Sequence, residues 1–300
     1  MSELRDTQLL RDPARFVEQK IKDFVLNSQE SRLAFLNDYM MFDEPLVRFA
    51  DGDDTIFTEY KEIIGPVHLT PREAMAASFN KTKEELPARL SVISWILPII
   101  EGTRQSNRIE TNGPSRLWSH TRWYGEKLNE KLGEYMVKML TGEGYLAVTP
   151  HWQPYFKTMS NEKGPFSNWS ERHIAFAAGH GTFSLSDGFI TERGIAHRCA
   201  SVVTSLELPV SPRTAAGPYS NCLMYVGVEC RACINRCPAG AITENGHNKP
   251  LCQQHMRTLG YNPGEFSKNG YKNDTSVAGC GLCQTKVPCE HENPTRKLKK

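Results

Sequence analysis

Cysteine is absent from the first 198 of the 300 residues, and all nine cysteines lie between Cys199 and Cys289. A long apolar run is also absent. The most apolar stretch, residues 90–100, is interrupted by two serines and a proline, and it is shorter than the roughly 20 residues that a membrane-spanning helix needs. The sequence therefore does not predict a helical membrane protein, and its thiols are confined to one third of the chain.

An excess of one charge is missing as well. The chain has 36 Lys and Arg residues against 34 Asp and Glu residues, so its net charge of +2 does not indicate a nucleic-acid partner, although it does not exclude one. The first thirty residues carry many charges and no export signal. With 39% hydrophobic residues, we expect a globular cytoplasmic protein with a sizeable core. Disulfides are improbable in that reducing compartment, so clustered cysteines indicate metal ligation first.

Helical and strand patterns alternate along the first two thirds of the chain. Three segments have the pattern of amphipathic or buried helices: residues 14–26, 123–140 and 171–178. Three short apolar or β-branched runs predict buried strands: residues 90–97, 145–149 and 201–206. This alternation is typical of an α/β or α+β domain with a central sheet, which we assign to residues 1–210.

The composition changes after this domain. Residues 209–220 contain three prolines and little apolar material, which predicts a linker or an extended segment. The second domain, residues 211–300, holds eight cysteines and few large aliphatic residues. A segment with so small a core needs additional stabilisation, such as bound metal, to keep a fold.

The first cysteine motif has the spacing of an iron–sulfur site. Cys230, Cys233 and Cys237 with the following proline match the last three positions of the bacterial ferredoxin run, C-x2-C-x2-C-x3-C-P. The first position of that run is occupied by Gly227, and Cys222, five residues upstream, is the candidate for the missing ligand. The alternative is that Cys222 is a free thiol and that Cys199 or another residue completes the site.

A second motif supplies the remaining thiols. Cys280 and Cys283 repeat the C-x2-C spacing, Cys289 follows six residues later, and Cys252 stands between the two motifs. Eight thiolates are what two [4Fe–4S] clusters require. A four-cysteine zinc site is the alternative, but it leaves four cysteines without a role and does not account for the Cys-Pro pair. Cys199 is the odd thiol, which we interpret as a small buried apolar residue.

The ferredoxin pattern also predicts how the ligands divide. The cysteine before proline ligates the cluster that the other half of the domain holds. The two predicted ligand sets are therefore Cys237, Cys252, Cys280 and Cys283 for one cluster, and Cys222, Cys230, Cys233 and Cys289 for the other.

Three blocks together resemble the corrinoid iron–sulfur reductases, the family of epoxyqueuosine reductase and the reductive dehalogenases. They are the strand near residues 91–98 with residues 118–124, the glycine-containing block 171–188 that continues to 201–209, and the cysteine domain. The resemblance covers roughly residues 85–290. It implies a nitroreductase-like domain that holds base-off cobalamin, followed by a ferredoxin-like domain whose clusters pass electrons to cobalt for a reductive cleavage or deoxygenation.

The resemblance also implies site residues, and this sequence departs from the family at some of them. Gly179, Gly181 and Ser184 lie in the block expected against the corrin, where Ser184 replaces a glycine. Pro165 occupies the position of the proton-donating aspartate of epoxyqueuosine reductases, so no catalytic residue is assigned. Tyr124 and Tyr155 are alternative candidates for a proton donor.

The leading hypothesis is a cobalamin-dependent reductase with two [4Fe–4S] clusters that acts on a small or nucleoside-like substrate. A low-potential ferredoxin or flavodoxin is the expected electron donor. Two other hypotheses stay open: an electron-transfer protein that reduces the corrinoid of a partner and has no substrate of its own, and a structural or regulatory iron–sulfur module.

Overall fold

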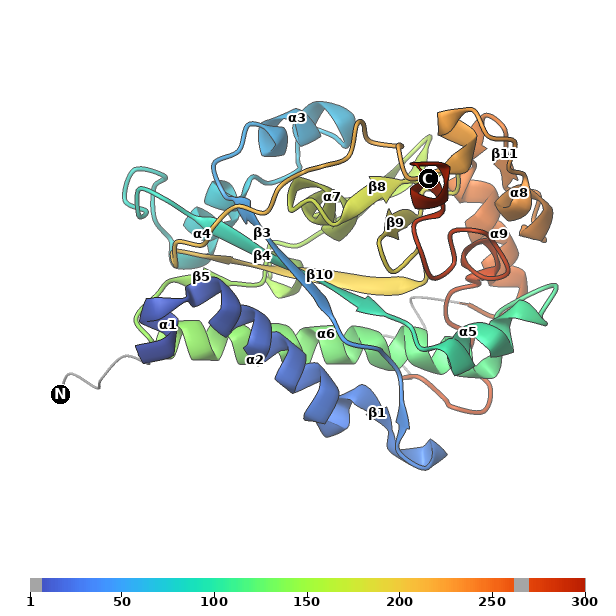
Figure 1. The fold of residues 1–300 in the computed structure, drawn as a ribbon, viewed down its shortest axis with the longest axis horizontal. Helices are drawn as coiled ribbons and strands as arrows, with labels where there is room; N and C mark the ends of the chain where they lie inside the picture. Colours follow the sequence, from blue (N-terminus) through green and yellow to red (C-terminus); the bar gives the residue numbers. More distant parts are fainter. Residues whose placement is uncertain (1–6, 262–269, 300) are drawn as a thin grey trace.

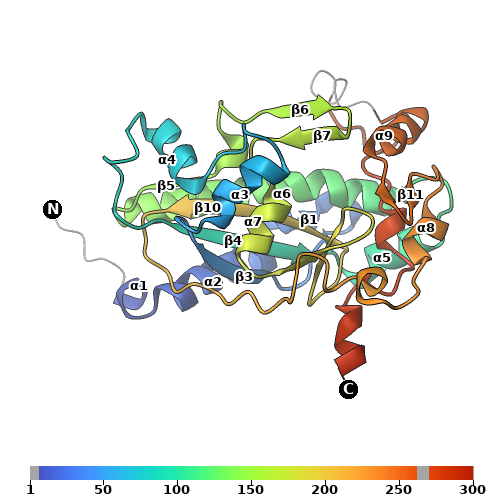
Figure 2. The ribbon, with the colours of Figure 1, turned by 90° about the horizontal axis from the view of Figure 1, so that it is seen from above.

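A four-stranded antiparallel sheet forms the centre of the protein (Figures 1 and 2). The computed structural model describes residues 7–261 and 270–299. The strands, in their order across the sheet, are β3 (Leu46–Asp51), β4 (Ser91–Pro98), β10 (His197–Thr204) and β5 (Ala147–Val148). All eight residues of β4 are buried, because β4 is an inner strand covered on both faces. An antiparallel sheet with helices on its faces is the α+β form of the expected architecture.

Two layers of helices cover the sheet (Figure 1). On one face lie α2 (Pro13–Asn27) and the long α6 (Arg116–Gly142), whose apolar residues share a core with Trp95 of β4. On the other face lie α3 (Ile56–Ile63), α4 (Pro71–Phe79) and α7 (Glu171–Ala177). Successive residues of a strand point to opposite faces, so Ala200 and Val202 join the first core while Val203 joins the second.

Shorter elements complete the fold. The helices are α1 (Thr7–Arg11), α5 (Glu101–Arg108), α8 (Ala232–Arg236) and α9 (Lys249–Thr258). Four two-stranded pairs join β1 (Arg32–Leu33) to β2 (Tyr39–Met40), β6 (Thr158–Asn161) to β7 (Gly164–Ser167), β8 (Gly181–Phe183) to β9 (Phe189–Thr191), and β11 (Ile242–Thr243) to β12 (Gly246–His247). The 3-10 turns are η1 (Gln29–Ser31), η2 (Ala34–Leu36), η3 (Pro150–Trp152), η4 (Leu223–Val226), η5 (Leu282–Gln284) and η6 (Pro294–Lys299).

The cysteine-bearing region packs against the end of the sheet at which β10 begins (Figure 1). The backbone N–H of Ile195 donates to the carbonyl of Cys289 at 2.8 Å. The Arg236 guanidinium of α8 donates to the carbonyl of Glu110 at 2.8 Å, and its second nitrogen donates to the carbonyl of Asn107. Hydrogen bonds to backbone carbonyls thus connect the cysteine-bearing region, residues 222–289, to the segments that adjoin the central sheet. In the described part of the chain, no helix has the length and apolarity that crossing a membrane requires.

Most of the predicted elements are confirmed, with different bounds. The helix predicted at 123–140 begins earlier, at Arg116, because the Ser115 side chain caps it by accepting a hydrogen bond from the Trp118 N–H. The strand predicted at 201–206 begins at His197, and that predicted at 145–149 contains only Ala147–Val148. Strand β3 was not predicted, because its sequence LVRFAD mixes charged residues into a short run. Residues 209–220 contain no helix or strand, as expected for an extended segment.

Candidate functional site

Eight of the nine cysteines form two groups of four around two neighbouring pockets. The first thiol group, which lines one pocket with Leu185 and Val287, comprises Cys222, Cys230, Cys233 and Cys289. The second thiol group, which lines the other pocket with Ile242 and Gln284, comprises Cys237, Cys252, Cys280 and Cys283. All nine cysteines are free thiols. The grouping by space differs from the grouping by sequence motif, since Cys237 and Cys289 each lie apart from their nearest sequence neighbours.

Helix α8 separates the cysteines of the first motif. Cys233 lies in α8 and Cys230 just precedes it, whereas Cys237 follows the helix in an extended conformation, with its Sγ accepting a hydrogen bond from the Ala241 N–H at 3.3 Å. Cys233 and Cys237 therefore border different pockets, although only three residues separate them in the sequence. This is the arrangement that the Cys-Pro motif predicts.

Cys222 reaches the first thiol group through a short turn. The four residues after it form η4, which ends at Gly227 with a φ of 80°. A positive φ is strained for residues with a side chain, so glycine at this position allows the chain to turn back toward Cys230. The displacement of Cys222 from the ferredoxin spacing is thus absorbed by one 3-10 turn.

Burial and neighbouring thiols raise the pKa values of four of these cysteines, Cys233, Cys280, Cys283 and Cys289. Desolvation is the main cause that raises the pKa of Cys233 and of Cys280 to about 11, and thiols of the same group add to each shift. Cys283 of the second group is influenced by Cys233 of the first, so the two groups adjoin. In the described residues, no three His, Cys, Asp or Glu side chains are arranged around a single metal ion. Four thiols spread around a pocket suit a four-iron cluster, in which each iron takes one thiolate.

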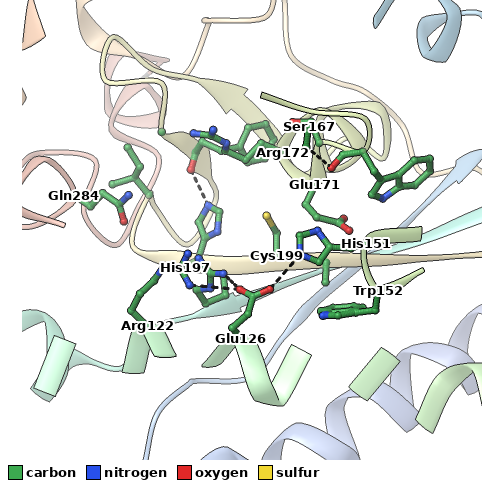
Figure 3. Close-up of a pocket in the computed structure, with 17 residues that line it drawn as sticks. Arg122, Glu126, His151, Trp152, Ser167, Glu171, Arg172, His197, Cys199 and Gln284 are labelled. Carbon is green, nitrogen blue, oxygen red and sulfur yellow. Dashed lines mark hydrogen bonds and ion pairs between the residues drawn. The ribbon is translucent and has the colours of Figure 1, made fainter. Parts of the chain in front are cut away.

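Next to the second thiol group lies the arginine-lined cavity, with a volume of about 470 Å³ (Figure 3). Its walls come from α6, η3, β7, α7, β9, β10, η5 and the loops between them. Its charged or titratable members are Arg122, Glu126, His151, Glu171, Arg172, His197, Arg198 and Cys199. It shares six wall residues with the pocket of the second thiol group: Arg122, Arg172, Gly188, His197, Arg198 and Gln284. The two spaces are therefore separated by no more than one layer of side chains.

The short strand β5 explains why a cavity exists here. β5 pairs with β10 only at Val203 and Thr204. Within the described residues, the outer edge of β10 from His197 to Val202 has no strand beside it. The cavity occupies the space along this edge, between α6 on one side of the sheet and α7 on the other. Cys199, interpreted from the sequence as a buried apolar residue, lies partly buried in its wall.

Positive charge dominates the cavity. Glu126 is paired with Arg198, and its Oε2 lies 3.5 Å from Arg122. The Arg172 guanidinium donates to the carbonyl of Asp187 and has no carboxylate partner of its own in the described part of the chain. Burial lowers the pKa of His151 to about 4, and also that of His197, so neither imidazole is charged at neutral pH.

Several polar atoms of this cavity are buried without a partner in the described part of the chain. They are Nδ1 of His151, Nδ1 of His197, Nε of Arg198 and Oε1 of Glu171. Buried polar groups are nearly always hydrogen-bonded, so unpaired ones that line a cavity indicate a polar ligand.

Glu171, the first residue of α7, was not singled out from the sequence. Its Oε2 accepts a hydrogen bond of 2.7 Å from Ser201 of β10. Burial is the main cause that raises the pKa of Glu171 to about 8. An acidic residue in the first turn of a helix is ordinarily an exposed residue that stabilises the helix dipole, so the sequence contains no signal for this role.

The three residues expected at the corrin do not share one cavity. Gly179 and Gly181 border a space of about 550 Å³ that also contacts Arg213, whereas Ser184 faces the first thiol group and bonds Ser186 at 3.0 Å. A Cβ on Gly179 would lie 2.6 Å from the carbonyl oxygen of Pro212, and one on Gly181 would overlap the carbonyl of Ile190. The close backbone approaches that these glycines permit are thus made within the chain itself.

The remaining candidates lie in different places. Pro165 of β7 borders the pocket of the second thiol group. The Tyr155 hydroxyl bonds Ser78 and the carbonyl of Ala74, outside the cavities that adjoin the thiols. The Tyr124 hydroxyl donates to Asn273 at 2.8 Å, also away from the arginine-lined cavity. Neither tyrosine lines the cavity that adjoins the second thiol group.

No protein-family model matches the chain, and no curated protein matches it. Among solved structures, the chain is similar to epoxyqueuosine reductase from Bacillus subtilis, with 19% identity and a TM-score of 0.44 over 93% of this chain and 70% of that one. Epoxyqueuosine reductase with an epoxyqueuosine-modified tRNA stem loop gives the same values. Selenomethionine-labelled epoxyqueuosine reductase is 18% identical, with a TM-score of 0.41 over 93% of this chain and 71% of that one.

Proposed function

We propose that the chain is an iron–sulfur oxidoreductase of the cobalamin-dependent kind. Two [4Fe–4S] clusters would carry electrons from a low-potential protein donor, such as a ferredoxin or flavodoxin, toward a cobalamin beside the second thiol group. The reaction is a reductive cleavage or deoxygenation of a small or nucleoside-like substrate. The observation that carries the proposal is the spatial division of eight thiols into two adjoining groups of four, one of which borders a polar cavity.

The donor sets fit the clusters. Each group supplies the four thiols that one cluster takes. No carboxylate or imidazole lines the pocket of the first group, whereas Asp187, His197, His247 and His255 also border the pocket of the second. Cys222, Cys230, Cys233 and Cys289 would hold one cluster, and Cys237, Cys252, Cys280 and Cys283 the other. Since Cys283 lies near Cys233, electrons can pass from the first cluster to the second without leaving the cysteine-bearing region.

The arginine-lined cavity fits the periphery of a corrinoid. A corrinoid carries several amide side chains, which can pair with the buried unpartnered atoms of His151, His197 and Arg198. We identify the bound group as cobalamin because the glycine and cysteine blocks resemble those of the corrinoid iron–sulfur reductases. When bound, cobalamin would supply a strongly reducing cobalt centre for the substrate bond that breaks. Gly179, Gly181 and Ser184 do not line this cavity; the first two border a separate space, and Ser184 borders the pocket of the first thiol group.

The test is anaerobic reconstitution with iron, sulfide and cobalamin, followed by metal analysis and electron paramagnetic resonance. We expect about eight irons and eight labile sulfides per chain, because eight thiolates serve two cubanes. Stoichiometric zinc without labile sulfide would overturn the proposal. Two clusters without any cobalamin affinity would favour the alternative, a protein that reduces the corrinoid of a partner.

Substrate class is tested on the same sample with titanium(III) citrate as the electron source. A tRNA stem loop that carries epoxyqueuosine tests deoxygenation, read by mass spectrometry as loss of one oxygen atom. A halogenated phenol tests reductive cleavage, read as release of halide. Turnover of either with loaded protein, and none with protein that lacks cobalamin, is the expected result.

A further inference from the structure

The arginine-lined cavity contains two carboxyl groups, those of Glu126 and Glu171, and they differ in their partners. Glu126 is bonded to two arginines, whereas Glu171 contacts no cation that the described structure records. Figure 3 shows the Glu171 side chain extending from the start of α7 to the side of the cavity where Cys199 and His151 lie. Its Oε1 atom is buried and has no hydrogen-bond partner in the described part of the chain.

The hydrogen bonds around Glu171 determine which of its oxygens carries a proton. The indole N–H of Trp169 can only donate, and it donates to Ser201 Oγ at 3.1 Å. Ser201 therefore directs its single hydroxyl hydrogen to Glu171 Oε2, which acts as the acceptor at 2.7 Å. A proton bound by this carboxyl group then resides on Oε1, the oxygen without a partner, and is available to a molecule in the cavity.

We infer that Glu171 is the proton donor to the substrate that is reduced in the arginine-lined cavity, a role that rests on the proposed function. The first support for this role is the chain of hydrogen bonds in which Trp169 donates to Ser201 and Ser201 donates to Glu171. The second is the unpaired Oε1 atom in a cavity that adjoins the second thiol group. Burial keeps this carboxyl protonated near neutral pH, which general acids of this type require.

Other cavity groups are less suited to give a proton. His151 and His197 are neutral, because burial lowers the pKa of each to about 4, so neither holds a dissociable proton beyond that of the neutral ring. Burial raises the pKa of the Cys199 thiol to about 12, so it releases a proton reluctantly. The charged groups of the other walls are Arg122 and Glu126 of α6 and Arg198 of β10, with Arg172 on α7 itself.

The reaction balances with a single proton from Glu171. An epoxide takes up two electrons and two protons to give an alkene and water. The external protein donor would supply the electrons one at a time, and the two thiol groups would hold the clusters that carry them. The Glu171 proton passes to the ring oxygen as the first C–O bond breaks, and water supplies the second proton. For a halogenated carbon, two electrons and one proton give C–H and a halide ion. In both cases the Glu171 carboxylate then regains its proton from water.

The test compares Glu171→Gln, Glu171→Asp and the matched control Glu134→Gln on the exposed side of α6, all reconstituted alike. The first readout is the infrared band of a protonated carboxyl group, which needs no turnover. We expect this band in the parent protein and in the control, titrating near pH 8, and its absence from Glu171→Gln. A band that Glu171→Gln leaves unchanged would overturn the inference, because Glu171 would then be ionised.

The second readout is single-turnover oxidation of the reduced protein by the epoxyqueuosine stem loop. In Glu171→Gln we expect a loss of about 100-fold or more, the usual contribution of a general acid. Reduction of the clusters and cobalamin by titanium(III) citrate should be unaffected, and Glu171→Asp should recover part of the rate. Unchanged turnover in a fully loaded Glu171→Gln protein would refute the role of Glu171 and leave the proposed function intact. Failure of the parent protein to bind clusters or cobalamin refutes the proposed function, while the infrared readout still decides whether Glu171 is protonated.

Discussion

Arg108 at the end of α5 binds both carboxylate oxygens of Glu290, the residue after Cys289. Its Nε lies 2.9 Å and 3.0 Å from the two oxygens, and its Nη2 lies 2.6 Å from Oε1. Glu290 is only 2% exposed and also accepts a hydrogen bond from the Lys286 N–H. This pair joins α5 to the residue that follows Cys289 of the first thiol group.

Arg108→Ala should destabilise the protein by about 2 kcal/mol, since the buried Glu290 carboxylate loses its closest hydrogen-bond donor and keeps only the more distant Arg104, at 3.6 Å, as an ion-pair partner. The first cluster should be lost before the second, because Glu290 positions Cys289. Denaturant unfolding and iron content measure the two effects. The control is Lys131→Ala, which breaks an exposed pair with Glu134 and should change stability by less than about 1 kcal/mol. Equal stability of the two variants would contradict the prediction.

Cysteine variants should reveal the division of ligands between the clusters. Cys222→Ala and Cys289→Ala should perturb the same cluster signal in electron paramagnetic resonance, because both thiols border one pocket. Cys252→Ala should perturb the other signal. Cys199→Ala is the matched control and should leave both signals intact, since Cys199 borders neither pocket. If Cys222→Ala leaves both spectra unchanged, Cys222 is not a ligand.

Stability should depend on the ionisation of Glu171. Its pKa rises from 4.5 to about 8 in the folded protein, so between these values the folded state holds a proton that the unfolded chain has released. Folding stability due to this group is therefore present at low pH and is lost as pH rises toward 8. We expect Glu171→Gln to gain stability relative to the parent protein as the pH rises from 4.5 to about 8. A pH-independent difference in denaturant midpoints would mean that Glu171 has an ordinary pKa.

Gly181 should be intolerant of any side chain, whether or not cobalamin is present. A Cβ at this position overlaps the Ile190 carbonyl to which β8 is paired, so Gly181→Ala should cost about 1–3 kcal/mol by overpacking. Gly217→Ala, where a Cβ meets no atom within 4 Å, is the matched control and should be close to neutral. The measurement is thermal unfolding of the protein without cofactors. An unaffected Gly181→Ala protein would show that β8 and β9 can separate at no cost.

The sequence by itself predicted most of the helices and strands, and its cysteine spacing is the basis of the iron–sulfur proposal. Cysteine spacing reports ligand chemistry because a C-x2-C turn places two thiols together by local geometry alone. The α2 and α7 helices and strand β4 were also predictable, because apolar periodicity reflects which side of an element is buried. Helix α6 begins before the apolar pattern does, because the Ser115 side chain caps the N-terminus of the helix.

Only the tertiary structure decided where the polar cavity lies and which acid enters it. The cavity exists because β5 ends after two residues, and this depends on strand pairing between segments more than 50 residues apart. Glu171 has the sequence context of an ordinary first-turn carboxylate, and it becomes a buried acid only when β10 places Ser201 against it. Burial and ionisation are properties of the assembled environment, because desolvation requires that distant segments of the chain exclude water together.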